Sequence, residues 1–449
     1  MLLKLLFVSL LSLTMLVKGN AQIYDKATLD KYFDRLAEKN KAMGTLVIST
    51  EGNAIYSRSI GYGLISETVK NPLTEASRYR IASVTKMYTA VMILQLNEEG
   101  RLKLTDPLSN FFPQIPNAGK ITIGHILQHR SGISNIRREQ DLQGVSKSPL
   151  RTIPITKEEM LALIAKGTPD FEPDTDHLYS NSGYFLLGLI IEKLTNKTYE
   201  EELKERISSK IGLRNTYLAT GNIDVSQNES LTYSYLGGSW KQHIEMHPSI
   251  LFGAGSIIST PFEMCTFIET LFGLKLISQQ SVTLMKTMRD GEGMGMESFQ
   301  FAGKTFYGHT GGGDNYGAWL AYLPEEKLAI AYTTNAKVHP VADIMKDITD
   351  IYFNQPFQIP EFESIYVSPE ILDKYVGIYT IEGAPMIFTV TRNGSTLFIQ
   401  PHGQSAAPLE AIAQDKFEIA PGVVFEFHAA KNQMIVKRPN GERIFTKEN

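Results

Sequence analysis

The sequence is poor in cysteine and has no excess of basic residues. Cys265 is the only cysteine among 449 residues, which excludes an internal disulfide. Because this thiol sits in the apolar helical pattern EMCTFIETLF, we expect it to be a buried structural residue and not a nucleophile. A net charge of −4 leaves no basic footprint for nucleic acid. The stability of the chain must therefore come from its hydrophobic core.

The apolar run at the start of the chain is too short to span a membrane. It covers residues 5–17, about 13 residues, whereas a spanning helix needs about 20. Lys4 precedes the run, and the small residues Gly19 and Ala21 follow it, which is typical of a signal peptide cleaved after Ala21. We therefore expect residues 1–21 to be a signal peptide. The mature protein is expected to be exported, periplasmic or secreted, with no membrane span.

The remaining chain divides into two parts of different character. Residues 22–355 have predicted strands at both ends and helices between them. This order predicts an α+β domain whose antiparallel sheet is assembled from both ends of the segment. A proline-containing linker is expected at residues 356–365. Short alternating segments and the turn signal Asn393-Gly394 predict that residues 366–449 form a small all-β meander or barrel.

The first of three motifs that carry chemistry is Ser83-Val84-Thr85-Lys86. Helical geometry puts Lys86 one turn away from Ser83 on the same face. A serine hydroxyl is a poor nucleophile at neutral pH and needs a nearby base or cation. The free N–H groups of a helix start can also stabilise an oxyanion. A capped core helix with a snorkelling lysine would show the same spacing, so this motif alone leaves both interpretations open.

The second motif is Tyr179-Ser180-Asn181, directly before a strongly apolar helix. A neighbouring ammonium group lowers the pKa of a tyrosine. We therefore expect Lys86 to hold a cation between Ser83 and Tyr179, so that Tyr179 accepts the serine proton and later activates water. Asn181 is expected to hydrogen-bond the substrate amide and the lysine. A tyrosine in an ordinary turn is the alternative, and His129 in LQHRSGI is expected to fix its loop.

The third motif, in FYGHTGGGDNYGAWLAY, is predicted to form a glycine-rich edge strand. His309 and Thr310 are expected to face the substrate, while Gly311 and Gly312 let a ligand approach the backbone. The N–H group of Gly312 is the candidate second oxyanion donor. A glycine bulge with a satisfied histidine is the alternative. No metal or other cofactor is expected, since HIEMH lacks the glutamate that follows the first histidine of the zinc-protease pattern.

The set of three motifs resembles the serine β-lactamase and penicillin-binding superfamily. The resemblance is to the branch of class C β-lactamases, D-alanyl-D-alanine carboxypeptidases, D-aminopeptidases and related esterases. It covers residues 25–353 and is supported by the stretches ITIGHILQHRSGI, FGAGSIISTPFEM and TTNA. It implies an antiparallel sheet flanked by helices, beside an all-helical lobe, with the site between them. It also implies an acyl-enzyme on Ser83, assisted by Lys86, Tyr179 and Asn181.

Two departures from the family pattern lean away from an efficient β-lactamase. The third motif begins with His309, where many β-lactamases have lysine, and no E-x-x-L-N follows the second motif. The expected function is therefore that of an exported serine hydrolase resembling a D-Ala-D-Ala carboxypeptidase or D-amino-acid peptidase. Its expected substrates are a small peptide, a D-amino-acid amide, an ester or a β-lactam. An esterase, a weak class C-like β-lactamase and a non-hydrolytic peptide- or penicillin-binding protein are the alternatives, and the sequence leaves the oligomeric state open.

Overall fold

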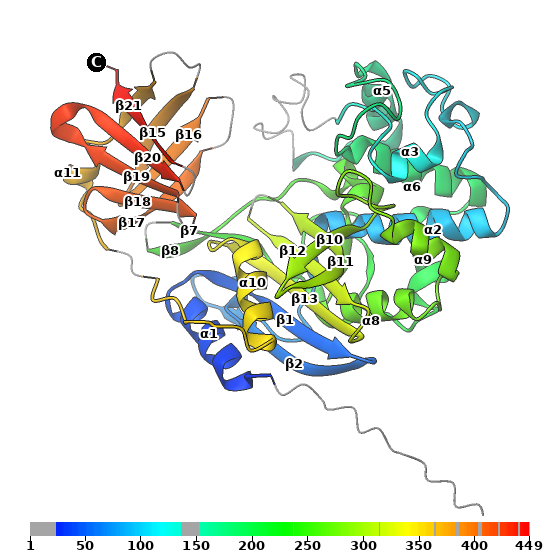
Figure 1. Ribbon diagram of the computed structural model, residues 1–449, viewed down its shortest axis with the longest axis horizontal. Coiled ribbons are helices and arrows are strands. Elements are labelled where there is room, and N and C mark those ends of the chain that lie inside the picture. Colours follow the sequence, from blue (N-terminus) through cyan, green and yellow to red (C-terminus); the bar gives the residue numbers. More distant parts are fainter. Residues whose placement is uncertain are drawn as a thin grey trace, which may run out of the picture.

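The structure consists of an α+β part followed by a closed β-barrel (Figure 1). The expected signal peptide lies outside the residues that the structure describes. Among the described residues, no helix is both long and apolar enough to cross a membrane. The computed structural model describes residues 24–135, 152–236, 238–313, 315–362, 365–381, 386–402, 406–420, 423–438 and 441–448.

The main sheet joins the two ends of the α+β part, as the sequence predicted. Its strand order is β10-β11-β12-β13-β1-β2, and every neighbouring pair is antiparallel. The first strand after the N-terminal helix therefore pairs with the last strand of this part. The strands are β1 (Ala42–Thr50), β2 (Asn53–Ile60), β10 (Glu297–Phe301), β11 (Lys304–Gly312), β12 (Gly317–Leu323) and β13 (Leu328–Lys337).

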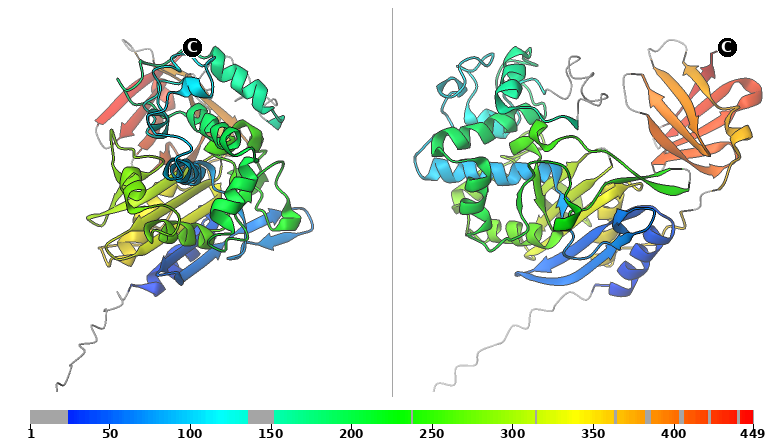
Figure 2. Two further views of the ribbon diagram at one scale, coloured as in Figure 1. Left: turned by 90° about the vertical axis from the view of Figure 1, so that its right-hand side faces the viewer. Right: turned by 180° about the vertical axis from the view of Figure 1, so that it is seen from behind.

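Helices cover both faces of this sheet and form a lobe beside it. The helices α1 and α10 share one core with the sheet, in which Phe33, Tyr332 and Ile348 are wholly buried. On the other side α8 packs against β1 and β13, and α2 and α6 form the centre of the helical lobe (Figure 2). The helices are α1 (Lys26–Glu38), α2 (Thr85–Glu98), α3 (Ile123–Leu127), α5 (Lys157–Lys166), α6 (Asn181–Thr195), α7 (Tyr199–Leu203), α8 (Pro261–Phe272), α9 (Gln279–Lys286), α10 (Val341–Tyr352) and α11 (Pro369–Leu372).

The third motif lies in β11, and the prediction that this strand forms the edge of the sheet is wrong. The edge of the sheet is β10, which the sequence did not indicate, and it pairs with the first half of β11. This pairing ends at Glu297 opposite Gly308. Residues 309–312 continue beyond it and pair only with β12 on the other side. The motif itself therefore has one unpaired strand edge, although the strand that carries it does not lie at the edge.

The C-terminal part is a closed barrel in which each strand pairs with the next and the last closes on the first. This confirms the expected all-β meander or barrel. The turn at Gly394, whose φ is +59°, joins two strands as the sequence signal indicated. The barrel strands are β14 (Gly377–Thr380), β15 (Ile387–Asn393), β16 (Thr396–Pro401), β17 (Ala407–Ala413), β18 (Lys416–Ala420), β19 (Val423–His428), β20 (Gln433–Arg438) and β21 (Gly441–Lys447).

Short strands and the lone thiol complete the α+β part. Cys265 is wholly buried, and burial raises its pKa well above the usual value, which confirms the structural thiol. The short strands are β3 (Tyr62–Ile65) with β4 (Lys70–Pro72), β5 (Tyr79–Arg80) with β9 (Ile257–Ser259) and β6 (Tyr217–Leu218), and β7 (Tyr233–Leu236) with β8 (Ser239–Gln242).

The segment between the two parts is attached to the α+β part by aromatic side chains. The ring of Phe357 meets that of Tyr32 edge to face, with centroids 5.5 Å apart. Phe362 lies 5.4 Å from the Lys41 ammonium nitrogen and 5.0 Å from the ring of His339. Lys41 also forms an ion pair with Glu410 of the barrel. The described part of this segment is therefore attached to the α+β part at Phe357 and Phe362.

Candidate active site

Ser83 lies in a 3₁₀ turn (Ala82–Val84) that leads directly into α2. The preceding residue, Ala82, has a φ of +45°. Gly311 of β11 lies directly against this turn, because a Cβ atom added there would be 2.3 Å from the carbonyl oxygen of Ile81. The same atom would be 3.1 Å from the backbone nitrogen of Ser83. Glycine in the third motif therefore permits the sheet to approach the backbone around Ser83, which a larger residue would prevent.

Lys86 is wholly buried, and its ammonium nitrogen lies among three oxygen atoms. It donates to Ser83 Oγ at 3.1 Å, to Asn181 Oδ1 at 2.8 Å and to the carbonyl oxygen of Ala254 at 2.8 Å. Three acceptors match the three N–H donors of a charged lysine. The ring of Tyr179 lies 4.6 Å from the same nitrogen, within range of a cation–π contact. The structure thus brings Ser83, Lys86, Tyr179 and Asn181 together.

The loop that carries Tyr179 is held by His129. The two rings stack with centroids 4.3 Å apart and an interplanar angle of 29°. The backbone N–H of Ser180 donates to His129 Nδ1 at 3.1 Å, and that of Leu178 donates to the His129 carbonyl oxygen at 3.0 Å. Both contacts confirm the expectation that His129 fixes this loop. Asn181 follows as the first residue of α6, whose N-cap is Ser180.

His309 is buried, and its ring is held by the backbone of the next residue. Its Nδ1 lies 2.5 Å from the carbonyl oxygen of Thr310, and since a carbonyl only accepts, this nitrogen carries the hydrogen. Burial lowers the pKa of His309, and Lys86 adds to this effect while Glu297 opposes it. The imidazole is therefore neutral at pH 7. The backbone N–H of Thr310 donates to Glu297 Oε2 at 2.8 Å, and its hydroxyl donates to Oε1 at 3.3 Å.

A half-buried carboxyl group, that of Glu292, lies beside the histidine that holds the tyrosine loop. Its Oε2 is 3.4 Å from His129 Nε2 and 3.6 Å from His177 Nε2. Burial raises the pKa of Glu292 to about 7, with a further contribution from Glu297 and an opposing one from Lys86. Burial also lowers the pKa of His129 well below its usual value. The Glu292 carboxyl group therefore changes charge near neutral pH.

Sequence reasoning missed the Ala254 carbonyl, Glu292 and Glu297. Ala254 lies in FGAGSIISTPFEM, a stretch that supported the family resemblance, but its carbonyl gives no residue signal. Glu292 and Glu297 lie in GEGMGMESF, just before the third motif, and nothing in their local pattern indicates that they lie near the site. The arrangement as a whole supplies a nucleophile, a buried cation, a phenol and a hydrogen-bonding amide. These groups can perform acyl transfer.

Comparisons with known proteins agree with this fold. Penicillin-binding protein 4* of Bacillus subtilis is 25% identical over 418 residues, which is 87% of this chain and 90% of that protein. The octameric penicillin-binding protein homologue from Pyrococcus abyssi has a similar structure, with a TM-score of 0.65, 23% identity and coverage of 94% of this chain and 100% of that one. A D-stereospecific amidohydrolase from Streptomyces has a TM-score of 0.63 and 24% identity, and covers 73% of this chain and 99% of its own.

The family model with the description Beta-lactamase matches residues 29–350, which include all three motifs. This range covers the α+β part from α1 to α10 and excludes the barrel. The resemblance inferred from the motifs is therefore confirmed, and the chain belongs to the β-lactamase family of serine hydrolases.

Proposed function

We propose that this protein is an exported amide hydrolase that forms an acyl-enzyme on Ser83 and acts next to a D-amino acid. The observation that carries the proposal is the position of the Lys86 ammonium group, which donates to both Ser83 Oγ and Asn181 Oδ1 beside the ring of Tyr179. The D-stereospecific amidohydrolase with a similar fold supports the substrate class. A D-Ala-D-Ala carboxypeptidase and a D-amino-acid peptidase are the two forms of this activity that we propose.

In the acylation step, Ser83 Oγ attacks the substrate carbonyl carbon and loses its proton to Tyr179. Tyr179 accepts the proton as a phenolate, and Lys86 makes this form accessible, because a nearby cation lowers the pKa of a tyrosine. We assign Lys86 as the cation, since its Nζ lies within hydrogen-bond distance of three oxygen atoms, and Tyr179 as the base. The N–H groups of Ser83 and Gly312 are the proposed donors to the oxyanion. When the C–N bond breaks, Tyr179 returns the proton to the leaving amine.

Deacylation reverses these roles with water in place of the amine. Tyr179 takes a proton from water, the hydroxide adds to the acyl carbon, and Ser83 leaves with the proton. Asn181 and the backbone around Thr310 are proposed to hold the substrate amide. A neutral His309 offers no fixed positive charge to the carboxylate of a β-lactam, which argues against efficient β-lactamase activity.

The proposal is tested by single-turnover assays with four substrates. These are a D-Ala-D-Ala peptide, a D-amino-acid amide, a p-nitrophenyl ester and a chromogenic cephalosporin. We expect the first or second to acylate Ser83 fastest. Peptide mass mapping should find the acyl group on the peptide that contains Ser83, and no acyl group in Ser83→Ala. Faster turnover of the ester alone would indicate an esterase. An acyl group on Cys265, or undiminished turnover by Ser83→Ala, would exclude Ser83 as the nucleophile.

Export is proposed from the N-terminal pattern and has its own test. Expression of the full chain in a bacterial host should yield mature protein outside the cytoplasm that begins at Gln22. N-terminal sequencing of the fractionated protein measures this. An intact N-terminus in the cytoplasmic fraction would contradict it.

A further inference from the structure

Two arginines lie on the inward face of the C-terminal barrel, at one of its ends. In the ladder between β20 and β21, Val436 is opposite Arg443, and Arg438 is opposite Gly441. Opposite residues of an antiparallel pair share a face, and so do alternate residues of one strand. Because Val436 and Phe445 are buried in the barrel core, Arg443 and Arg438 share their inward direction. The polypeptide thus places two guanidinium groups where a barrel normally has apolar side chains.

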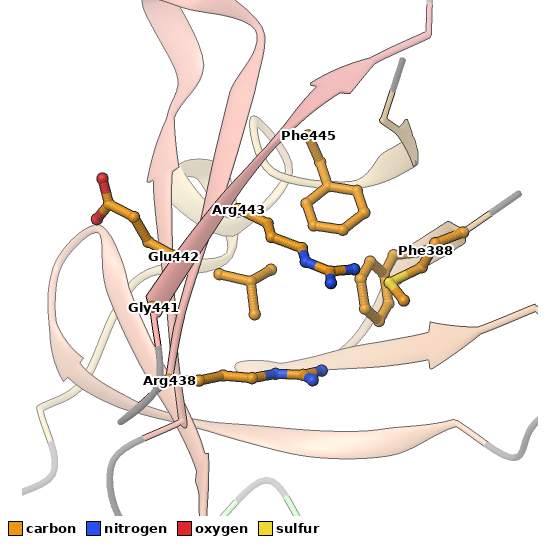
Figure 3. A pocket seen from close by; sticks show the side chains of 8 residues that line it. Phe388, Arg438, Gly441, Glu442, Arg443 and Phe445 are labelled. Carbon is orange, nitrogen blue, oxygen red and sulfur yellow. The ribbon is translucent and has the colours of Figure 1, made fainter. Parts of the chain in front are cut away.

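The two guanidinium groups reach into one cavity of about 140 Å³ (Figure 3). Its apolar wall consists of Phe388, Phe445, Met386 and Val436. The rings of Phe388 and Phe445 meet edge to face, with centroids 4.9 Å apart and an interplanar angle of 70°. Figure 3 shows Glu442 directed away from the arginines, so this neighbouring carboxylate does not neutralise them. The cavity therefore combines a cationic side with an aromatic wall.

Two lysines of the barrel share a carboxylate partner, whereas, among the described residues, the two arginines of the cavity do not. Lys437 and Lys416 both lie within ion-pair distance of Glu426, at 2.6 and 3.7 Å. Within the described part of the chain, neither Arg438 nor Arg443 has a carboxylate oxygen within 4.0 Å. Both side chains are exposed, so a ligand can reach them from outside. Guanidinium groups bind carboxylates and phosphates through paired hydrogen bonds, which makes an oxyanion the matching partner.

We propose that this end of the barrel binds a small organic anion, namely a carboxylate or phosphate group on an apolar body about the size of a benzene ring. Arg438 and Arg443 hold the oxyanion, while Phe388 and Phe445 contact the apolar body. The size follows from the cavity volume, because an engineered cavity of about 150 Å³ is known to hold benzene. The mouths of β-barrels are common positions for such ligands. This site is independent of the proposed hydrolase activity.

Binding is measured with the full-length Ser83→Ala protein, so that no probe is turned over. Isothermal titration with benzoate and with phenyl phosphate tests the two head groups, and benzyl alcohol serves as the neutral analogue. We expect saturable binding of at least one anion, at least about tenfold weaker binding of benzyl alcohol, and a loss of affinity as salt rises. The tighter of the two anions identifies the head group.

Substitutions then assign the binding to the two arginines. Arg438→Gln and Arg443→Gln should each weaken binding by at least about tenfold, and the double substitution should abolish it. Lys437→Gln is the matched control, because it removes the same charge from the same strand but on the outward face. It should change the affinity by less than about twofold. Arg443→Lys keeps the charge and loses the planar fork, so it should also weaken binding if a Gln variant does not fold.

Three results would overturn the proposal. The first is no saturable binding of either anion up to about 10 mM, which corresponds to an affinity too weak for a built site. The second is an equal loss of affinity in Lys437→Gln and in the arginine variants, which would indicate a general charge effect. The third is inorganic phosphate binding as tightly as phenyl phosphate and benzoate, which would remove the role of the aromatic wall.

Discussion

Replacing Tyr179 with phenylalanine separates its hydroxyl group from its ring. The ring stacks on His129 at 4.3 Å and lies 4.6 Å from the Lys86 nitrogen, and phenylalanine preserves both contacts. The variant should therefore keep the loop and the position of Lys86 while losing the proposed proton acceptor. A general base contributes about 10²–10⁴-fold to the rate, so kcat should fall within this range with a smaller change in KM. This corresponds to about 2.7–5.4 kcal/mol of transition-state stabilisation.

Tyr184 provides a matched control in the same environment. Its ring lies 5.5 Å from the Lys86 nitrogen and 5.1 Å from the His129 ring, but its hydroxyl donates to the carbonyl oxygen of Leu127 at 2.7 Å. Tyr184→Phe removes this hydrogen bond, but the Leu127 carbonyl still accepts from the backbone N–H of Gly295 at 3.2 Å, so the variant should lose about 0.5–1.5 kcal/mol of folding stability and little activity.

Steady-state kinetics measures kcat for both variants, and denaturant unfolding measures the free energy of unfolding of both. A kcat loss under about threefold in Tyr179→Phe would refute the role of its hydroxyl and leave Lys86 as the base. Equal kcat losses in both variants would show that the effect comes from packing around Lys86.

Three further predictions concern Glu292, His309 and the segment before the barrel. Because burial raises the pKa of Glu292 from 4.5 to about 7, its contribution to stability is fully present below pH 4.5 and is lost as pH rises through 7. In the wild type, the free energy of unfolding should therefore fall by up to about 3 kcal/mol between pH 5 and 8, and Glu292→Gln should remove this fall. Denaturant unfolding at several pH values measures it, and the same pH dependence in both proteins would contradict the prediction. Since burial lowers the pKa of His309, the ring becomes charged only below about pH 6.5. The KM of a carboxylate substrate should therefore fall below that of its methyl ester only in this acidic range. His309→Lys should extend this gain to neutral pH, and identical profiles for both substrates in the wild type would exclude a carboxylate contact. A chain ending after Phe362 should fold and hydrolyse a small ester. A chain ending at Pro356 loses the contacts of Phe357 and Phe362, so its free energy of unfolding should be about 2 kcal/mol lower. Equal stability of the two truncated chains, or an inactive but folded longer chain, would contradict this.

The sequence by itself determined features that depend on residues close together in the chain. The spacing of Ser83 and Lys86 fixes their common face because one helical turn brings them together, and the structure places their polar atoms 3.1 Å apart. The capping box of Thr156 and Glu159 likewise forms between residues three apart. The barrel followed from alternation and turn signals, since both are local properties of strands and hairpins.

Only the tertiary structure decided features that depend on burial and on distant partners. The third acceptor of Lys86 is the carbonyl of Ala254, 168 residues away, and a backbone carbonyl leaves no mark in the sequence. The edge strand β10 pairs with the first half of β11 but not with the motif. Where this pairing ends depends on the register between the two strands. The raised pKa of Glu292 and the lowered pKa of His309 arise mainly from loss of water around each group. Desolvation is a property of everything packed around a residue, so local spacing encodes which groups are present, whereas the fold decides how each one is charged.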